Sequence, residues 1–212
     1  ITIDMQHGQS DYSSSMPMLQ ALSSSTSTPM VRVPWYEPGI IMRMLDLGVL
    51  GIIAPMINTN EDCEKFVSYC YYPPIGQRSF GPMRAQLIHG SNYFEKANQN
   101  ILSFAMIETQ QAVDNLDEIL SVPNLTGVYI GPADMSSSYG MKPKFDVKED
   151  PVFSNIKLIA KKANEYGKIA GIHNGTTQYA KEMIGLGFKL VTISSDFRSM
   201  SAHAQSVIDD MK

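Results

Sequence analysis

Two stretches decide the fold class: Met106-Ile107-Glu108-Thr109 and, further along the chain, Ile130-Gly131-Pro132-Ala133-Asp134. An apolar run comes before a carboxylate in each stretch, Glu108 in the first and Asp134 in the second. In α/β proteins, side chains just beyond the C-terminal ends of buried parallel strands form the active site. Two carboxylates at neighbouring strand ends can converge on one divalent cation. The sequence therefore predicts a parallel sheet with a cation site at its C-terminal edge.

Short β-rich runs alternate with longer amphipathic segments, which is typical of parallel strands joined by helical crossovers. We expect strands at residues 1–5, 30–33, 51–55, 102–107, 127–130, 169–172 and 190–193. We expect helices at residues 17–23, 38–47, 60–70, 110–120, 151–166, 177–186 and 200–211. These strands are one βα unit short of a (β/α)8 TIM barrel, which typically takes about 250 residues. The sequence predicts such a barrel with its first βα unit missing here, and a doubly wound sheet is the alternative.

The composition is that of a single globular domain spanning residues 1–212. Hydrophobic residues make up 43% and charged residues 18%, and the net charge of −4 argues against nucleic acid or an anionic membrane as partner. No apolar run of about 18 residues is present, so we expect no membrane span. The two cysteines, Cys63 and Cys70, are too far apart on a predicted helix for a disulfide, which favours a reducing cytoplasm.

Residues 71–98 interrupt the alternation with a high density of glycine and proline, which predicts a long ordered loop. Long loops in compact domains are usually functional, so we expect this one at the active site or a subunit interface. Arg78 and Arg84 could bind anionic ends of a substrate or make ion pairs between subunits, and His89 could line the site. His203 falls on the terminal helix, where we expect it at the surface or in an interface.

Polar side chains follow several of the predicted strands and would face one rim of a parallel barrel. Glu108 and Asp134 suit a hard cation such as Mg²⁺ or Mn²⁺, because water and substrate oxygens can complete the coordination. Arg32 carries a fixed positive charge suited to a carboxylate or a developing enolate oxygen. The other polar groups at strand ends are Asp4, His7 and His173-Asn174.

His7 is the best candidate base, because its unperturbed pKa is the closest to neutrality among side chains. Asp46 lies at the end of an apolar helix, where the helix dipole disfavours a negative charge. This unfavourable position indicates another use, and we expect Asp46 to accept from His7 and fix its orientation. For any one of these residues alone, the alternative is a helix cap or a solvated loop side chain.

Six motifs occur in the order seen in one enzyme family. They are Asp4-Met5-Gln6-His7-Gly8, Val31-Arg32-Val33-Pro34, Leu45-Asp46-Leu47-Gly48, Tyr72-Pro73-Pro74-Ile75-Gly76-Gln77-Arg78, Ile107-Glu108-Thr109 and Gly131-Pro132-Ala133-Asp134-Met135-Ser136. Over essentially its whole length the chain resembles the HpcH/HpaI aldolase family. Members of that family are class II, metal-dependent pyruvate aldolases that act on 4-hydroxy-2-oxo acids. Six motifs in register are far more specific than any one of them.

The resemblance implies a (β/α)8 barrel of the phosphoenolpyruvate/pyruvate-domain type and a role for each matched residue. It implies a divalent metal, Mg²⁺, Mn²⁺ or Co²⁺, on Glu108 and Asp134. It implies that His7 pairs with Asp46 as the acid/base system. Arg32 matches the arginine that contacts the keto oxygen of the substrate.

The resemblance also implies how substrate and subunits are bound. Gly131, Pro132, Ala133 and Asp134 would receive the pyruvate carboxylate at a helix N-terminus, which is a favourable place for an anion. Family members are homo-oligomers, trimers or hexamers, in which the terminal helix is exchanged between neighbours. Residues 200–212 are the matching helix in this chain.

The activity implied is that of an aldehyde-lyase, which cleaves a 4-hydroxy-2-oxo acid to pyruvate and an aldehyde through a metal-stabilised enolate. Two residues depart from the family pattern. Gln6 stands where many members carry Glu. Met106 stands where many members carry Gln, and its thioether cannot donate a hydrogen bond as the Gln amide can. The alternatives are an oxaloacetate decarboxylase with macrophomate-synthase-like enolate chemistry, and a non-catalytic protein that binds keto acids.

Overall fold

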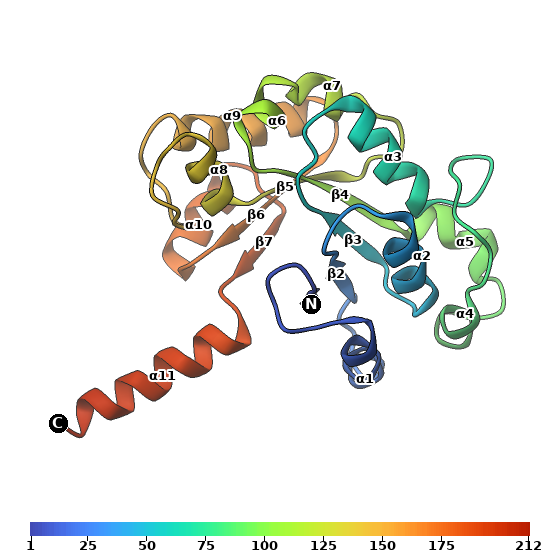
Figure 1. Ribbon diagram of the computed structural model, residues 1–212, viewed down its shortest axis with the longest axis horizontal. Helices are drawn as coiled ribbons and strands as arrows, with labels where there is room; N and C mark the ends of the chain where they lie inside the picture. The colour runs from blue at the N-terminus through green and yellow to red at the C-terminus, as the bar shows by residue number, and fades with distance from the viewer.

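The computed structural model describes residues 1–212 and contains one sheet of seven parallel strands, in the order β1-β2-β3-β4-β5-β6-β7. The strands are β1 (Thr2–Asp4), β2 (Met30–Arg32), β3 (Gly51–Ala54), β4 (Leu102–Ile107), β5 (Gly127–Ile130), β6 (Ile169–Asn174) and β7 (Leu190–Ile193). The sheet curls into a partial barrel with the helices outside it, and β1 and β7 form its two edges (Figure 1). All the predicted strands are confirmed. Strand order follows chain order without reversal, which excludes the doubly wound alternative.

The helices cover the outer surface of the curled sheet (Figure 1). They are α1 (Tyr12–Leu22), α2 (Pro38–Asp46), α3 (Asn60–Cys70), α4 (Met83–His89), α5 (Tyr93–Asn100), α6 (Gln110–Asp114), α7 (Leu116–Leu120), α8 (Pro132–Ser138), α9 (Val152–Glu165), α10 (Thr177–Gly185) and α11 (Asp196–Asp210). The last of these, α11, buries no residue and projects away from the barrel (Figure 1). None of the helices combines the length and the apolar character that crossing a membrane requires.

The segment 71–98 differs from the sequence expectation, because helices α4 and α5 replace much of the predicted loop. Both helices are rich in good helix formers, and the glycines and prolines of the segment precede or separate them. Tyr72, Ala85, Tyr93 and Ala97 bury one face of each helix in a small cluster of their own. The prediction of a loop was wrong for this part because its composition, dominated by glycine and proline at the start, concealed two short helices.

Other helices also differ from expectation, and α11 begins at Asp196 rather than at residue 200. Helix α1 begins at Tyr12 rather than at residue 17, because Asp11 forms a capping box with Ser14. The Asp11 carboxylate accepts from the Ser14 N–H at 2.7 Å, and the Ser14 hydroxyl accepts from the Asp11 N–H at 2.8 Å. Residues 110–120 form two short helices that meet at Asn115, and the short helix α8 was not predicted.

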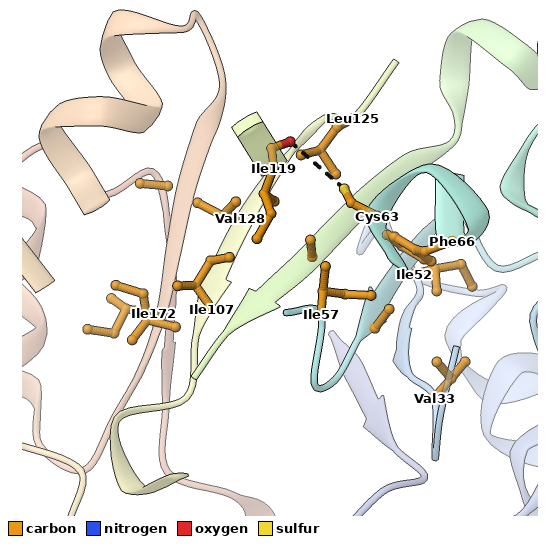
Figure 2. Packing of buried hydrophobic residues seen from close by; sticks show 14 of the residues in the cluster. Val33, Ile52, Ile57, Cys63, Phe66, Ile107, Ile119, Leu125, Val128 and Ile172 are labelled. Atoms are coloured by element: carbon orange, nitrogen blue, oxygen red, sulfur yellow. Dashed lines mark hydrogen bonds between the residues drawn. The ribbon is translucent and has the colours of Figure 1, made fainter. Parts of the chain in front are cut away.

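Alternation of side chains along the strands separates two layers of core. Outward-facing residues such as Ile52 and Val128 pack against the helices in a cluster of 41 buried residues, the main core of the protein. Figure 2 shows this layer, with Cys63 on α3 donating a weak hydrogen bond to the Ile119 carbonyl at 3.9 Å. Cys63 and Cys70 are buried and free, which confirms the expected absence of a disulfide. The inward-facing layer is a smaller cluster of Met30, Ile53, Phe104, Met106 and Tyr129.

The parallel topology gives the partial barrel two chemically different ends. All strands run in one direction, so the residues that follow them lie at the C-terminal rim. The helices run back toward the opposite end, so the C-terminal residue of each crossover helix lies near the start of the next strand. Within one chain, a residue at a strand end and a residue at the end of a crossover helix therefore lie at opposite ends of the barrel.

The core predicts a specific stability difference. Ile52 is fully buried between the sheet and the helices, so Ile52→Ala should lower the free energy of unfolding by about 2–5 kcal/mol through lost transfer energy and the cavity left behind. Ile184 is 59% exposed, and Ile184→Ala should change it by no more than about 0.5 kcal/mol. Urea unfolding followed by circular dichroism measures both. Equal effects of the two substitutions would contradict the assignment of the main core.

Candidate active site

Glu108 follows the central strand β4 directly and lies inside the partial barrel with 1% exposure. Its Oε1 accepts from the backbone N–H of Met56 at 2.8 Å, and its buried Oε2 has no hydrogen-bond partner. Burial raises the pKa of this carboxyl to about 7, and the nearby charge of Asp134 adds to the increase. The Met56 N–H and the charge of Arg32 act in the opposite direction. A buried carboxylate oxygen without a donor is unfavourable and suits a site that takes a cation or a proton.

The backbone around Glu108 is shaped to accept its carboxylate. Met56, just after β3, adopts the left-handed conformation with φ of 56°, which is unusual for a side chain of this size. Gly131 follows β5, and a Cβ at this position would lie 2.5 Å from Glu108 Oε2. The absence of a side chain at Gly131 therefore lets the β5 backbone approach the carboxylate closely. Met106 also borders this point, with its terminal methyl 3.0 Å from the same Cβ position.

Asp134 is brought to Glu108 by the turn from β5 into α8. Pro132 occupies the first position of α8, and Asp134 lies exposed in its first turn. No side chain caps this helix, so the N–H groups of Ala133 and Asp134 have no intrahelical acceptor by their position. The negative charge of Asp134 lies near enough to raise the pKa of the Glu108 carboxyl.

The donor set at this point fits a hard divalent cation. Glu108 Oε2 supplies an unpartnered buried oxygen, and Asp134 supplies a second carboxylate on the neighbouring strand end. No third His, Cys, Asp or Glu joins them to complete a ligand cluster. A cation that keeps water and takes substrate oxygens, as Mg²⁺ does, needs no more than this. A structural zinc site, which takes four protein ligands, is incompatible with it.

Arg32 lies at the end of β2 and is paired with Asp4 at the end of β1. Arg32 Nε donates to Asp4 Oδ1 at 2.9 Å and Nη2 donates to Oδ2 at 2.5 Å, so the guanidinium is held in a fork. Burial raises the pKa of Asp4, but the hydrogen bond and charge of Arg32 outweigh it and hold that pKa below its usual value. Asp4 also accepts from the backbone N–H groups of Gln6 and His7, which shapes the loop after β1. The position of Asp4 at a strand end was expected from the sequence, and its pairing with Arg32 was not.

His7 and Asp46 lie at opposite ends of the partial barrel, so the structure contradicts their pairing within one chain. His7 is exposed beyond the C-terminal end of β1, and its ring makes no hydrogen bond. Asp46 ends α2, which runs back toward the N-terminal end of β3, and its Oδ1 accepts from Arg78 at 2.8 Å. The physical reason is the direction rule: a crossover helix ends at the end of the barrel opposite to the rim where the strands end.

The remaining candidates also lie away from the rim. Arg84 donates to the Leu47 carbonyl, and the His89 ring bonds the Gly48 carbonyl at 2.9 Å, both near the start of β3. His89 therefore does not line the site, contrary to one sequence expectation. His203 is exposed on α11, as expected. Arg78 is buried, with its guanidinium 4.3 Å from the centre of the Tyr72 ring.

The structure adds a group of inward-facing polar residues near Arg32. Tyr129 on β5, His173 on β6 and Thr192 on β7 are joined by hydrogen bonds through the Thr192 hydroxyl. His173 was expected at a strand end from the sequence, whereas Tyr129 and Thr192 were not predicted to belong to the site. Alternation along β5 and β7 could have placed them inside, but only the tertiary structure shows that they meet.

The fold and site place the chain in the class of parallel α/β-barrel proteins with a carboxylate site at the strand ends. The chain belongs to the HpcH/HpaI aldolase/citrate lyase family, whose model matches residues 1–201. It is 41% identical over 212 residues to a hydroxypyruvate/pyruvate aldolase of Rhizorhabdus wittichii, covering 100% of this chain and 84% of that protein. It is 32% identical over 214 residues to a 5-keto-4-deoxy-D-glucarate aldolase of Escherichia coli, covering 100% and 83%. A crystal structure of a family protein from Burkholderia cenocepacia superposes with a TM-score of 0.91 at 26% identity, covering 99% and 84%.

The buried Glu108 carboxyl predicts a pH dependence of stability. Its pKa is about 7 in the folded protein against an ordinary value of 4.5, so between these values the folded state binds more protons than the unfolded chain. The free energy of unfolding should therefore fall as pH rises from about 5 to about 8, with a contribution of about 3 kcal/mol from this group. Glu108→Gln should remove that contribution, and Glu64→Gln on the exposed face of α3 should not. Urea unfolding of the metal-free protein measures it; the same pH slope in wild type and Glu108→Gln would refute the prediction.

Proposed function

We propose that this protein is a divalent-metal-dependent carbon–carbon lyase that cleaves a 4-hydroxy-2-oxo acid to pyruvate and an aldehyde. The observation that carries the proposal is the buried, unpartnered Glu108 oxygen beside Asp134 and Arg32 at the rim of the barrel. The family membership supports the same reaction class, since a 41% identical relative is named a hydroxypyruvate/pyruvate aldolase.

Glu108 and Asp134 are the residues that would hold the cation, Mg²⁺ or Mn²⁺ and as a third candidate Co²⁺. When bound, the cation would supply a Lewis acid for the carboxylate and keto oxygens of a 2-oxo acid. The raised pKa of Glu108 means that loading near neutral pH also releases its proton. The free N–H groups of Ala133 and Asp134 at the start of α8, with Gly131 and Pro132 forming the turn, would orient the carboxylate.

The chain's own residues divide the remaining work. His7 would take the proton from the substrate 4-hydroxyl, so that the C4–O bond becomes a carbonyl as the C3–C4 bond breaks. The electrons of that bond pass into the 2-oxo acid fragment, and negative charge develops on its keto oxygen. Arg32, fixed by Asp4, presents its remaining N–H groups to that oxygen and stabilises the charge as it forms. Protonation of C3 then yields pyruvate.

A homo-oligomer, a trimer or a hexamer, is part of the proposal. On α11 Phe197 and Met200 are 69% and 67% exposed, and Met211, which caps this helix, is 84% exposed. On α4 Met83 and Leu87 are 82% and 86% exposed. So much exposed apolar surface supports burial against further copies of the chain. Residues 200–212 would then pack on a neighbour. The free thiols of the buried cysteines support a reducing compartment such as the cytoplasm.

Pyruvate release tests the activity directly. The protein should release pyruvate from 4-hydroxy-2-oxo acids with Mg²⁺ or Mn²⁺ and lose activity with a chelator. Asp134→Ala should lower kcat/KM by at least about a thousandfold without unfolding the protein, because Asp134 is an exposed metal ligand. Asp114→Ala, at an exposed aspartate on α6, is the matched control and should retain activity.

The assay also separates the alternatives. Turnover of oxaloacetate alone would favour the decarboxylase, and tight pyruvate or oxalate binding without turnover of any substrate would favour a non-catalytic keto-acid-binding protein. No turnover and no binding with any of the metals would refute the proposal.

The proposed His7–Asp46 pair predicts a shared active site. Within one copy the two residues lie at opposite ends of the partial barrel. The pair therefore requires His7 of one copy and Asp46 of another. His7→Ala and Asp46→Asn should each be inactive as pure proteins. Mixed in equal amounts after dissociation and reassembly, they should recover about a quarter of wild-type sites, because some interfaces then combine two intact residues. Mixed oligomers without restored activity would contradict the shared site. Asparagine is chosen at position 46 because its amide oxygen can still accept from Arg78.

A further inference from the structure

A hydrogen-bonded chain of three side chains crosses the inside of the barrel from β5 to β7. The Tyr129 hydroxyl bonds the Thr192 hydroxyl at 2.5 Å, and Thr192 bonds His173 Nδ1 at 2.9 Å. Tyr129 is 5% exposed and packs in the inner apolar cluster, so its hydroxyl has been taken from water and given one partner. His173 is half-buried, and its Nε2 makes no hydrogen bond. None of the three belongs to the acid/base pair or the cation site described above.

The backbone is built to let Tyr129 reach Thr192. On β6, which lies between β5 and β7, Gly171 pairs with both Tyr129 and Leu190. A Cβ at Gly171 would lie 2.8 Å from Tyr129 Cδ2, so the tyrosine ring passes over β6 where a side chain is absent. His173 and Thr192 are register partners at the ends of β6 and β7. The contact therefore depends on a glycine placed opposite an aromatic ring.

The charges around the chain favour one arrangement of its protons. Burial lowers the pKa of His173, and the positive charges of Arg32 and Arg198 lower it further against a smaller opposing effect of Asp4 and Asp146. His173 is therefore neutral at neutral pH and can accept at Nδ1 from the Thr192 hydroxyl. Thr192 then accepts from Tyr129, and the phenol lone pairs are left for the positive field of Arg32, whose register partner Ile53 packs in the same inner cluster as Tyr129. The opposite direction would turn the phenol proton outward, in the field of the same guanidinium.

We propose that His173, Thr192 and Tyr129 form a positioning network that fixes the phenol oxygen of Tyr129 as a negative pole beside Arg32. Asp4 accepts from Nε and Nη2 and so holds one edge of the planar guanidinium, which leaves the N–H groups of Nη1 without an acceptor on the protein. The Tyr129 oxygen stabilises the orientation in which Arg32 faces the interior. This inference rests on the proposed function, since Arg32 is there the group that meets the keto oxygen.

The network should stabilise the negatively charged keto oxygen that develops during the reaction more than the neutral keto oxygen of the bound substrate. A misoriented Arg32 guanidinium weakens substrate binding little while the keto oxygen is neutral, and it weakens transition-state stabilisation more once that oxygen becomes negative. The variants should therefore lower kcat rather than raise KM. Tyr129→Phe and Thr192→Val should lower kcat about tenfold and change KM by less than about twofold. Thr192→Ser, which keeps the hydroxyl, should recover most of the loss. Thr2→Val on β1, where the hydroxyl makes no hydrogen bond, is the control for adding a valine to the sheet.

Two measurements test the network without turnover. Calorimetry of the Mn²⁺-loaded protein should show that Tyr129→Phe and Thr192→Val weaken oxalate, an inert mimic of the enolate, about five- to tenfold and pyruvate less than twofold. Long-range proton–nitrogen NMR correlations should show His173 protonated at Nε2 in wild type, and a mixture of tautomers in Thr192→Val.

The outcomes separate this inference from the proposed function. A wild-type protein that neither turns over nor binds oxo acids would overturn the function, and the NMR tautomer still decides whether the network is arranged as described. An active wild type whose variants lose oxalate and pyruvate equally would overturn the positioning role alone. Protonation of His173 at Nδ1 in wild type would overturn the network itself.

Discussion

Burial of the Glu108 carboxylate beside the backbone of Gly131 is the constraint on which the rest of the site depends. One oxygen is satisfied by the Met56 N–H and the other has no partner, so the group keeps a raised pKa in the folded protein. The free-energy cost of burying an oxygen without a hydrogen-bond partner is tolerated at functional sites, where a ligand supplies the missing interaction. Met56, whose backbone is left-handed, donates its N–H to Oε1, and the absence of a Cβ at Gly131 leaves space for Oε2.

A second constraint is the direction of the chain in a parallel barrel. Strands bring Asp4, Arg32, Glu108 and His173 to one rim, and helices return Asp46 to the other. Residues that look like partners in the sequence are therefore separated by the height of the barrel. Chemistry that needs both ends can be assembled only between copies, which ties the proposed activity to the exposed apolar faces of α4 and α11.

Much of the fold could be predicted from the sequence, because buried parallel strands are short continuous apolar runs between helical segments. All seven strands agree with expectation. The wrong predictions concern helices. Helices α4 and α5 lie in a segment whose glycines and prolines predicted a loop, and the Asp11 capping box starts α1 earlier than expected. Local capping and short helices leave weak periodic signals, so pattern alone does not place them.

The candidate site was likewise predictable from the sequence only in part. The sequence by itself indicated that Arg32, Glu108 and Asp134 lie at or just after the C-terminal ends of parallel strands, because apolar strand runs and the residues that follow them are local properties of the chain. Only the tertiary structure decided that Glu108 has an oxygen without a donor, that Asp46 is bound to Arg78 and that Tyr129 reaches Thr192. Those facts depend on distances between segments far apart in the chain, which are set by sheet curvature and packing and leave no mark in any one stretch of sequence.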